Sequence, residues 1–320
     1  MIAERAWDGE TITEPGVYRG IPLATYHDKP DLFDRPSVSK SALKWLLPSH
    51  GGSPKAFWGR WSFNRMRIEP EPSKALDFGK ATHALLLGDE DFSTAYAVHP
   101  SEYPNEKPRK GEGPTKAWNW NAGFCQEWRE RQGKRTIISP DQFNRIRAIR
   151  DDAARYPLVQ QGILNGRVER TMVYRDPETN VIVKVRPDVI PHADGIYSDL
   201  KTASKFSEDF LERQAFDCLY YLQGAMVRMA CRELGLPFET FVLLYVLNDD
   251  VPDTAHVELS EHELDRGERE IRWALKTIRQ CLDAGEWPGA RPFRAGEQHL
   301  QLKPFHKTKI DEFLELEEVA

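Results

Sequence analysis

The stretch from residue 181 to residue 203, VIVKVRPDVIPHADGIYSDLKTA, constrains the fold more than any other part of the chain. Both of its ends alternate between apolar and polar residues, as half-buried β-strands do, and the turn-forming sequence PHADG separates them. We therefore expect a β-hairpin whose first strand ends near Pro187. The polar faces of two such strands coincide, which places Asp188 beside Asp199 and Lys201 at one sheet edge.

Two carboxylates and a lysine at one sheet edge are typical of metal-dependent phosphodiester cleavage. Carboxylate oxygens are the hard ligands that a divalent cation prefers, and the backbone carbonyl of Leu200 is a further candidate ligand. Lys201 beside such a cation can orient or deprotonate water and offset charge on a phosphorane. A structural ion pair is the alternative, because an acidic residue two positions before a lysine is common in any chain.

The composition excludes several other classes of protein. With 40% hydrophobic residues the chain can bury a large core, and no apolar run approaches the roughly 18 residues that span a bilayer, so we expect a cytoplasmic protein without a membrane partner. The 4 cysteines show no C-x-x-C spacing, which argues against a structural zinc site and a disulfide framework. The net charge of −6 gives no general attraction to nucleic acid, so any DNA contact depends on local patches.

Local basic patches do occur. Basic residues, Arg60 among them, alternate with aromatic residues over 55–67, and a second basic series runs over 129–150. Such patches suit phosphate contact and base stacking, but a solvated helix face explains each equally well. The sequence SVSKSALKWLL places hydroxyl groups at the start of a helix, where ordinary capping is a better explanation than a phosphate site.

The remaining patterns predict alternating helices and strands. Helices are expected from residue 37 or 39 to 47, and over 75–87, 115–132, 140–156, 206–235 and 261–284. Strands are expected over 170–176, paired through the DPETN turn with 181–188, and over 239–247. Together they describe an α/β core with the candidate site at the edge of its sheet.

Five segments in this order carry a family resemblance: S-x-S-x-L-K at Ser39–Lys44, FGKATHALLL with His83, K-x-R-P-D at Lys184–Asp188, D-L-K-T at Asp199–Thr202, and Gln223. They span about 40–230. In this order the chain resembles the PD-(D/E)xK nuclease superfamily and, within it, the RecE-like branch. That branch comprises the C-terminal nuclease domain of exodeoxyribonuclease VIII and its phage relatives.

The resemblance implies roles for individual residues. His83, Asp188, Asp199 and the Leu200 carbonyl would bind metal, with Glu169 as an outer carboxylate that could share a second metal. Lys201 would be the catalytic lysine, assisted by Gln223. Val227 stands where the family's Q-x-x-x-Y motif has tyrosine, so Tyr220 or Tyr221 is a substitute one turn earlier. The candidate DNA-binding residues are Ser39, Ser41, Lys44, Arg60, Arg186, Lys205 and Tyr220.

The resemblance also implies an architecture. We expect an α/β nuclease core with a mixed central sheet flanked by helices. Residues 1–36 would form an N-terminal extension packed on the core, 37–300 a single nuclease domain with its metal-site core at about 75–250, and 301–320 an acidic C-terminal tail.

The function implied is 5′→3′ degradation of linear double-stranded DNA, which leaves 3′ overhangs for a single-strand annealing protein in recombination. Mg²⁺ would be the cofactor, Mn²⁺ would substitute, and Ca²⁺ would bind without supporting cleavage. A phage or prophage enzyme of this kind would form a homo-oligomeric ring, a trimer or tetramer, in the bacterial cytoplasm.

Two alternatives stay open. The first is another nuclease of the same fold, a structure-specific endonuclease or a Cas4- or AddB-like enzyme, although the lack of clustered cysteines argues against iron–sulfur types. The second is a non-catalytic DNA-binding recombination subunit. The presence of every metal-site residue type disfavours it, because an unneeded buried carboxylate pair is electrostatically costly.

Overall fold

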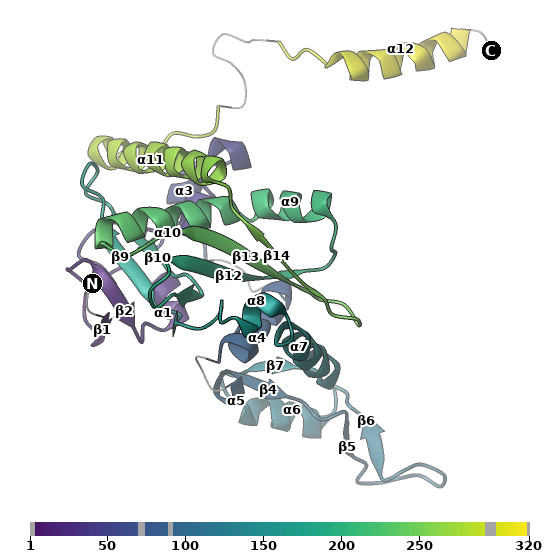
Figure 1. Cartoon of the computed structure of the whole chain (residues 1–320). Coiled ribbons are helices and arrows are strands. Elements are labelled where there is room, and N and C mark those ends of the chain that lie inside the picture. The colour runs from purple at the N-terminus through teal and green to yellow at the C-terminus, as the bar shows by residue number, and fades with distance from the viewer. Residues whose placement is uncertain (1–3, 70–73, 89–91, 292–298, 319–320) are drawn as a thin grey trace.

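The computed structural model describes residues 4–69, 74–88, 92–291 and 299–318. Its strands form two mixed five-stranded sheets and two small two-stranded sheets (Figure 1). The first large sheet has the order β1 (Glu4–Ala6), β2 (Gly16–Arg19), β9 (Thr171–Arg175), β10 (Ile182–Val185) and β3 (Ser37–Val38). The second has the order β14 (Thr254–Glu258), β13 (Thr240–Leu247), β12 (Ile196–Ala203), β11 (Val189–Ile190) and β8 (Arg167–Val168). The α/β class expected from the sequence is confirmed.

The helices cover both faces of the second sheet (Figure 1). On one face lie α10 (Tyr220–Leu234) and α11 (Glu261–Ala284), and on the other lie α4 (Lys74–Leu87) and α7 (Pro140–Ala153). This explains the continuous apolar run TFVLLYVL in β13, since a strand covered on both faces has no polar side. β13 pairs in parallel with all eight residues of β12, so the strand with Asp199 and Lys201 lies inside the sheet.

Shorter elements complete the chain. The remaining helices are α1 (Leu23–Asp28), α2 (Lys40–Leu43), the 3₁₀ helix η1 (Pro48–His50), α3 (Pro54–Trp58), α5 (Phe92–Ala95), α6 (Gly123–Arg131), α8 (Pro157–Gln160), α9 (Glu208–Asp217) and α12 (Pro304–Glu318). The small sheets pair β4 (Tyr96–Val98) with β7 (Thr136–Ile138), and β5 (Glu102–Pro104) with β6 (Thr115–Ala117). None of the helices that the structure describes is long and apolar enough to cross a membrane.

The predicted hairpin is wrong in its first strand. β10 pairs with β9, as the DPETN turn suggested, but it belongs to the first sheet and does not pair with β12. Pro187 follows β10 and has no N–H to continue a ladder, so the chain crosses to the second sheet there. The two-residue strand β11 then pairs with β12 through Val189 and Ser198. Asp188 therefore reaches β12 from the start of a new strand.

The single helix predicted over 206–235 is also wrong. It is divided into α9 and α10 at Leu219, whose φ of 59° lies in the left-handed region and cannot continue a right-handed helix. The Leu219 side chain is buried in the core, which holds the residue in this conformation. Two other predicted helices are shorter than expected: α2 has only four residues, and α6 begins at Gly123 because β6 occupies 115–117.

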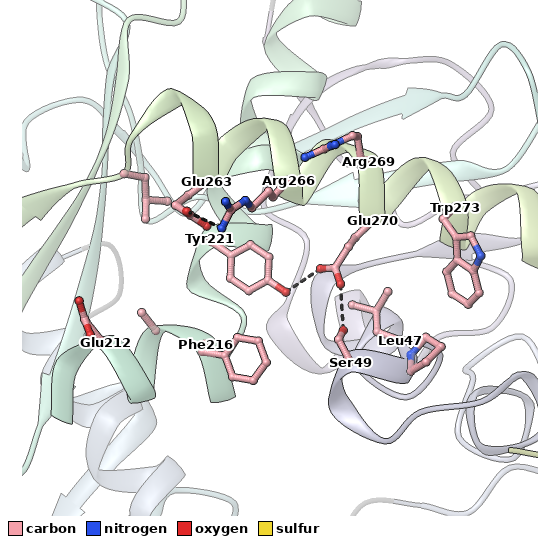
Figure 2. A pocket seen from close by; sticks show the side chains of 13 residues that line it. Leu47, Ser49, Glu212, Phe216, Tyr221, Glu263, Arg266, Arg269, Glu270 and Trp273 are labelled. Carbon is pink, nitrogen blue, oxygen red and sulfur yellow. Dashed lines mark hydrogen bonds and ion pairs between the residues drawn. The ribbon is translucent and has the colours of Figure 1, made fainter. Parts of the chain in front are cut away.

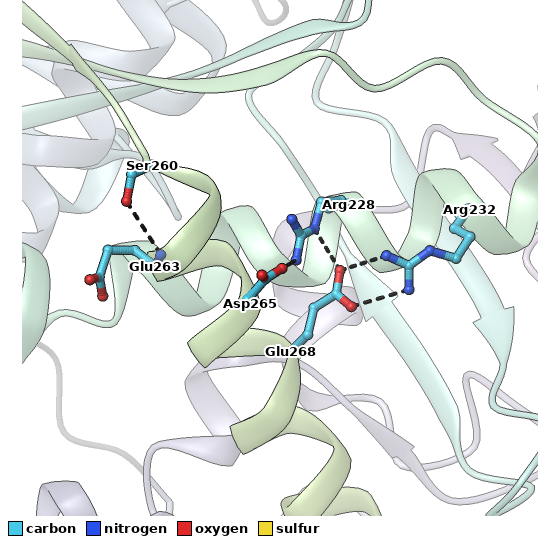
Figure 3. Close-up of polar contacts among 6 residues, drawn as sticks. All are labelled: Arg228, Arg232, Ser260, Glu263, Asp265 and Glu268. Atoms are coloured by element: carbon cyan, nitrogen blue, oxygen red, sulfur yellow. Dashed lines mark hydrogen bonds and ion pairs between the residues drawn. The ribbon is translucent and has the colours of Figure 1, made fainter.

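Helices α10 and α11 cross closely. A Cβ atom on Gly267 of α11 would lie 2.6 Å from the Cβ of Ala225, so only glycine allows this approach. Figure 3 shows the ion pairs beside the crossing, in which Arg228 contacts Asp265 and Glu268, each at 2.6 Å. The α11 helix begins after Ser260, whose Oγ caps it by accepting the N–H of Glu263 at 3.4 Å. This packing fixes the position of α10 over β12.

The N-terminal and C-terminal regions differ in their contacts with the rest of the protein. β2 pairs with β9, so residues 16–19 of the proposed N-terminal extension are part of the first sheet. At the other end α12 lies away from the body of the molecule (Figure 1). Every side chain described between 304 and 315 is exposed.

Candidate active site

Three potential metal ligands meet beside the short strand β11. They are His83 from α4, Glu169 at the end of β8 and Asp188 at the start of β11, and one donor atom from each lies within 4.8 Å of the others. The Nδ1 atom of His83 is 3.5 Å from Oδ2 of Asp188. One imidazole and two carboxylates form a donor set that suits a divalent cation.

The backbone holds Glu169 and Asp188 together. The N–H of Glu169 donates to the carbonyl oxygen of Asp188 at 2.9 Å, which extends the pairing of β8 with β11. Glu169 has a φ of 55°, a left-handed conformation that is unfavourable for a residue other than glycine. The sequence motifs gave Glu169 only an outer role. Its position beside His83 and Asp188 depends on this left-handed backbone conformation, which no motif reveals.

Asp199 lies on β12 next to this group, but its carboxylate has other partners. Its side chain is fully buried, its Oδ1 accepts from Nε2 of Gln223 at 2.5 Å, and its Oδ2 forms an ion pair with Nζ of Lys201. A peptide unit connects the two carboxylates, since the N–H of Leu200 donates to Oδ2 of Asp188 at 2.6 Å. In a strand the N–H and C=O of one residue point the same way, so the Leu200 carbonyl also faces the Asp188 side.

Two lysines lie beside Asp199. The Oε1 atom of Gln223 accepts from Nζ of Lys201 at 3.3 Å and from Nζ of Lys40 at 2.9 Å. Both ammonium groups lie over the ring of Tyr220, at 4.5 Å for Lys201 and 5.4 Å for Lys40. Gln223 therefore bridges Asp199 and both lysines, with an aromatic ring beneath them.

The environment makes both lysines easier to deprotonate than a lysine in water. Burial, together with the neighbouring Lys40, lowers the pKa of Lys201 to about 7. Burial also lowers the pKa of Lys40 to about 8. A lysine whose pKa lies near 7 can bind and release a proton at physiological pH.

Lys40 is the residue that sequence reasoning missed. It lies inside the matched S-x-S-x-L-K segment, but at a position that the motif leaves variable. The neighbouring serines contact each other, with 3.1 Å between the Oγ atoms of Ser39 and Ser41, and Ser39 makes no side-chain capping bond to α2. Only its tertiary environment, with contacts to Gln223 and the Tyr220 ring, distinguishes Lys40 from other lysines.

The remaining DNA-binding candidates are distributed over several surfaces. Lys44 donates to the carbonyl oxygen of Asp217 at 2.8 Å, and Arg60 stacks on Trp45 with 4.1 Å between its guanidinium carbon and the ring. Arg186 donates to Thr171 Oγ1 and to the Ile21 carbonyl oxygen, so it faces the first sheet. Lys205 is exposed after β12. Of these candidates, Tyr220 joins the lysines directly.

Val227, where the family motif has tyrosine, is fully buried in the core. A residue in this environment cannot reach substrate. The Tyr220 ring, one turn before Gln223, instead supplies the aromatic surface of the site.

The comparisons with known proteins agree with this architecture. A family model described as "PDDEXK-like domain of unknown function (DUF3799)" matches residues 40–295, and no curated protein sequence matches the chain. One solved structure with a similar fold is a protein from Eubacterium rectale that is provisionally named an exonuclease. It is 14% identical, with a TM-score of 0.51 over 85% of this chain and 91% of that one, so it shows the shared fold.

The matched range runs from Lys40 to beyond Gln223 and so contains every residue of the site described above. Because the match covers most of the chain, the protein belongs to this PDDEXK-like family, and with it to the PD-(D/E)xK superfamily that its sequence motifs indicate.

Proposed function

We propose that this protein is a divalent-metal-dependent exodeoxyribonuclease of the RecE-like type. The observation that carries the proposal is that a group of metal ligands lies next to a buried lysine–aspartate pair on β12, the central strand of the second sheet. The ligands are His83, Glu169 and Asp188, and the pair is Asp199 with Lys201. Membership of a PDDEXK-like family supports a nuclease.

The residues at the site fit a hard divalent cation. Two carboxylates and an imidazole would bind it, with the Leu200 carbonyl and Asp199 adjoining the group. Mg²⁺ is the expected ion, Mn²⁺ the expected substitute, and Ca²⁺ the ion expected to bind without turnover. A bound cation would polarise the scissile phosphate and lower the pKa of a coordinated water molecule.

The side chains of the site supply the proton transfer and the charge. With a pKa of about 7, Lys201 is partly unprotonated at neutral pH, so its Nζ can accept a proton from the attacking water. In its protonated form the same group offsets negative charge on the phosphorane. Gln223 fixes Nζ of Lys201 by hydrogen bonding, and Lys40 adds a second positive charge at the same amide oxygen.

The finer features of the proposal rest on the family resemblance. They are action on linear double-stranded DNA from 5′ ends, release of 3′ overhangs to a single-strand annealing protein, assembly into a ring, and a role in the bacterial cytoplasm. A ring with a basic channel would reconcile DNA binding with a net charge of −6.

A nuclease assay tests the proposal. Purified protein is incubated with end-labelled linear duplex or covalently closed circles, each with Mg²⁺ or Ca²⁺. We expect stepwise loss from the 5′ ends of linear DNA in Mg²⁺ only, with circles intact. Cutting of circles would show that the protein is an endonuclease of the same fold and not an exonuclease. DNA binding without hydrolysis would favour a non-catalytic recombination subunit.

A melting experiment tests the ligands separately from activity. Ca²⁺ that binds the folded state should raise the melting temperature of the wild type, because a ligand of the native state stabilises it. Asp188→Asn should abolish this rise, whereas Asp250→Asn, an exposed carboxylate on the β13–β14 turn, should retain it. An equal rise in the wild type and Asp188→Asn would remove Asp188 from the metal site.

A further inference from the structure

Residues 99–135 form an arm that contributes no residue to the candidate active site. The arm contains the β5–β6 hairpin and α6, which lie away from the two large sheets (Figure 1). It is connected to the body through the paired strands β4 and β7. Tyr96 of β4 and Ile138 of β7 belong to one hydrophobic cluster with Ala81 of α4. The arm is therefore attached to the helix that carries His83.

The arm is basic, although the chain as a whole is acidic. Residues 99–135 contain eight basic and five acidic side chains, in a chain of net charge −6. Several basic side chains of the arm have no hydrogen-bond or ion-pair partner among the residues that the structure describes: Lys107, Arg109, Lys110, Arg129 and Lys134. Unpaired positive charge of this kind attracts a polyanion.

The arm also contains three of the nine tryptophans of the chain, which form one aromatic cluster with His99. Trp118 stacks on His99 with 5.2 Å between the ring centroids, and Trp128 of α6 packs against Trp118 at 5.3 Å. Trp120 lies at a steep angle to both His99 and Trp118, at 5.2 and 5.4 Å. Its neighbours thus hold the Trp120 ring in place, yet the residue is 41% exposed.

A pocket of about 460 Å³ joins this exposed ring to one of the unpaired cations. Its lining consists of Trp120, Gln126, Arg129, Glu130 and Gly133. The volume lies within the roughly 300–1,000 Å³ of small-ligand sites. An indole ring offers a stacking surface for a nucleobase, and a guanidinium group binds phosphate. Glu130, the only acidic residue among the five, can accept from the exocyclic amino group of a base.

The groove shown in Figure 2 also has exposed aromatic side chains, but its charge is different. Phe216 and Trp273 lie on its wall and are 48% and 43% exposed. Three glutamates line the same groove: Glu212, Glu263 and Glu270. Arg266 already pairs with Glu263 at 3.1 Å. This groove does not suit a polyanion, so Trp273 provides a matched control for Trp120.

The chemistry of the arm favours a single strand over a duplex. In a duplex each base is covered by its neighbours, so an indole ring can stack only on an unpaired base. We infer that the arm binds single-stranded DNA, with a base on Trp120 and a phosphate on Arg129. The choice of DNA over RNA rests on the proposed function, which leaves a 3′ single strand. The arm holds that strand while the complementary strand is degraded at the metal site.

Fluorescence anisotropy with a labelled oligothymidylate in EDTA tests the role of Trp120. Trp120→Ala should weaken binding about 5- to 150-fold, because it removes the stacking of one base. Trp273→Ala, which removes an equally exposed tryptophan outside the arm, should bind like the wild type. Trp120→Phe keeps an aromatic ring and should retain most of the affinity, and circular dichroism checks that each variant is folded.

A salt titration tests the phosphate contact. For Arg129→Gln the slope of log K against log salt concentration should be shallower than that of the wild type by about 0.7, the value for one phosphate contact on a single strand. Arg232→Gln, at an exposed arginine of α10, should keep the wild-type slope.

Two outcomes would overturn the inference. One is equal affinity of Trp120→Ala and Trp273→Ala for the oligothymidylate, and the other is tighter binding of oligouridylate than of oligothymidylate by the wild type. No divalent cation is present in these measurements, so they do not depend on hydrolysis. The arm and the proposed nuclease activity therefore succeed or fail in separate assays.

Discussion

Lys40 holds the side-chain amide of Gln223 from the side opposite Asp199. Its Nζ donates to Gln223 Oε1 at 2.9 Å, and Gln223 Nε2 donates to Asp199 at 2.5 Å. The amide therefore cannot flip without losing both bonds. At the scale of single residues, we therefore expect Lys40 to position the lysine–aspartate pair and to be a second source of positive charge for a bound phosphate.

Replacement of Lys40 tests this role. We expect Lys40→Met to lower kcat for DNA hydrolysis about 10- to 100-fold, because a hydrogen bond to a charged group contributes about 1.5–3 kcal/mol. Lys276→Met, which removes an exposed lysine on α11 that pairs with Glu178, should have a small effect. Equal activities of the two variants would show that Lys40 has no part in the reaction.

Lys184, within the K-x-R-P-D motif, has a structural role in the first sheet. It is buried, its Nζ donates to the Tyr26 carbonyl oxygen, and it lies 4.7 Å over the Tyr26 ring. Burial, reinforced by Arg186, lowers the pKa of Lys184 from 10.5 to about 7. Between these two values the unfolded chain binds a proton on this residue that the folded protein does not bind.

This difference makes stability depend on pH in a definite direction. The contribution of Lys184 to the free energy of unfolding should rise as the pH increases from about 7 towards 10, because the unfolded state binds more protons there. Urea unfolding of the wild type and Lys184→Met at several pH values measures it. The free energy of unfolding of the wild type should increase relative to that of Lys184→Met as the pH rises. A difference that does not change with pH would show that the pKa of Lys184 is not depressed.

At the scale of elements, the sequence predicted the central strands and most of the helices around the site. β12 and β13 follow from strong apolar patterns, and β9 and β10 from the DPETN turn. The pairing of 181–188 with β12 could not be excluded from the sequence, since alternation does not say which sheet a strand joins. The break at Leu219 was hidden because leucine gives no signal for a left-handed conformation.

The sequence likewise predicted only part of the candidate site. The motifs identified Asp188, Asp199, Lys201 and His83, and the fold brings all four together beside β11 and the central strand β12, not at the edge of the sheet. Their division into a ligand group with Glu169 and a lysine pair with Asp199 depends on the crossing after Pro187. The roles of these residues stay predictions.

The crossing of α10 and α11 positions Gln223, so a side chain at Gly267 should disturb the packing that supports the site. Gly267→Val would place a side chain against Ala225 and the Tyr221 backbone, and we expect it to lower the free energy of unfolding by about 1–3 kcal/mol. Gly123→Val at the start of α6 is the control, since no atom lies within 4 Å of a Cβ there. Chemical denaturation measures both, and equal stability would mean that the helices can separate without cost.

At the scale of the whole molecule, the site is assembled from segments that are far apart in the chain. Lys40 begins α2 just after β3, His83 comes from α4, Glu169 and Asp188 lie where the chain passes between the two large sheets, and Gln223 comes from α10. Their meeting requires both large sheets and the helices on either face to be correctly packed. The central claim is that this meeting point hydrolyses DNA when a divalent cation is bound.

The most direct measurement is the rate of nucleotide release from end-labelled linear duplex in Mg²⁺ by the wild type, Lys201→Met and the control Lys276→Met. Loss of the proton acceptor and of its charge should reduce the rate of folded Lys201→Met at least about 100-fold, with Lys276→Met near the wild type. Hydrolysis by folded Lys201→Met at the wild-type rate would contradict the account.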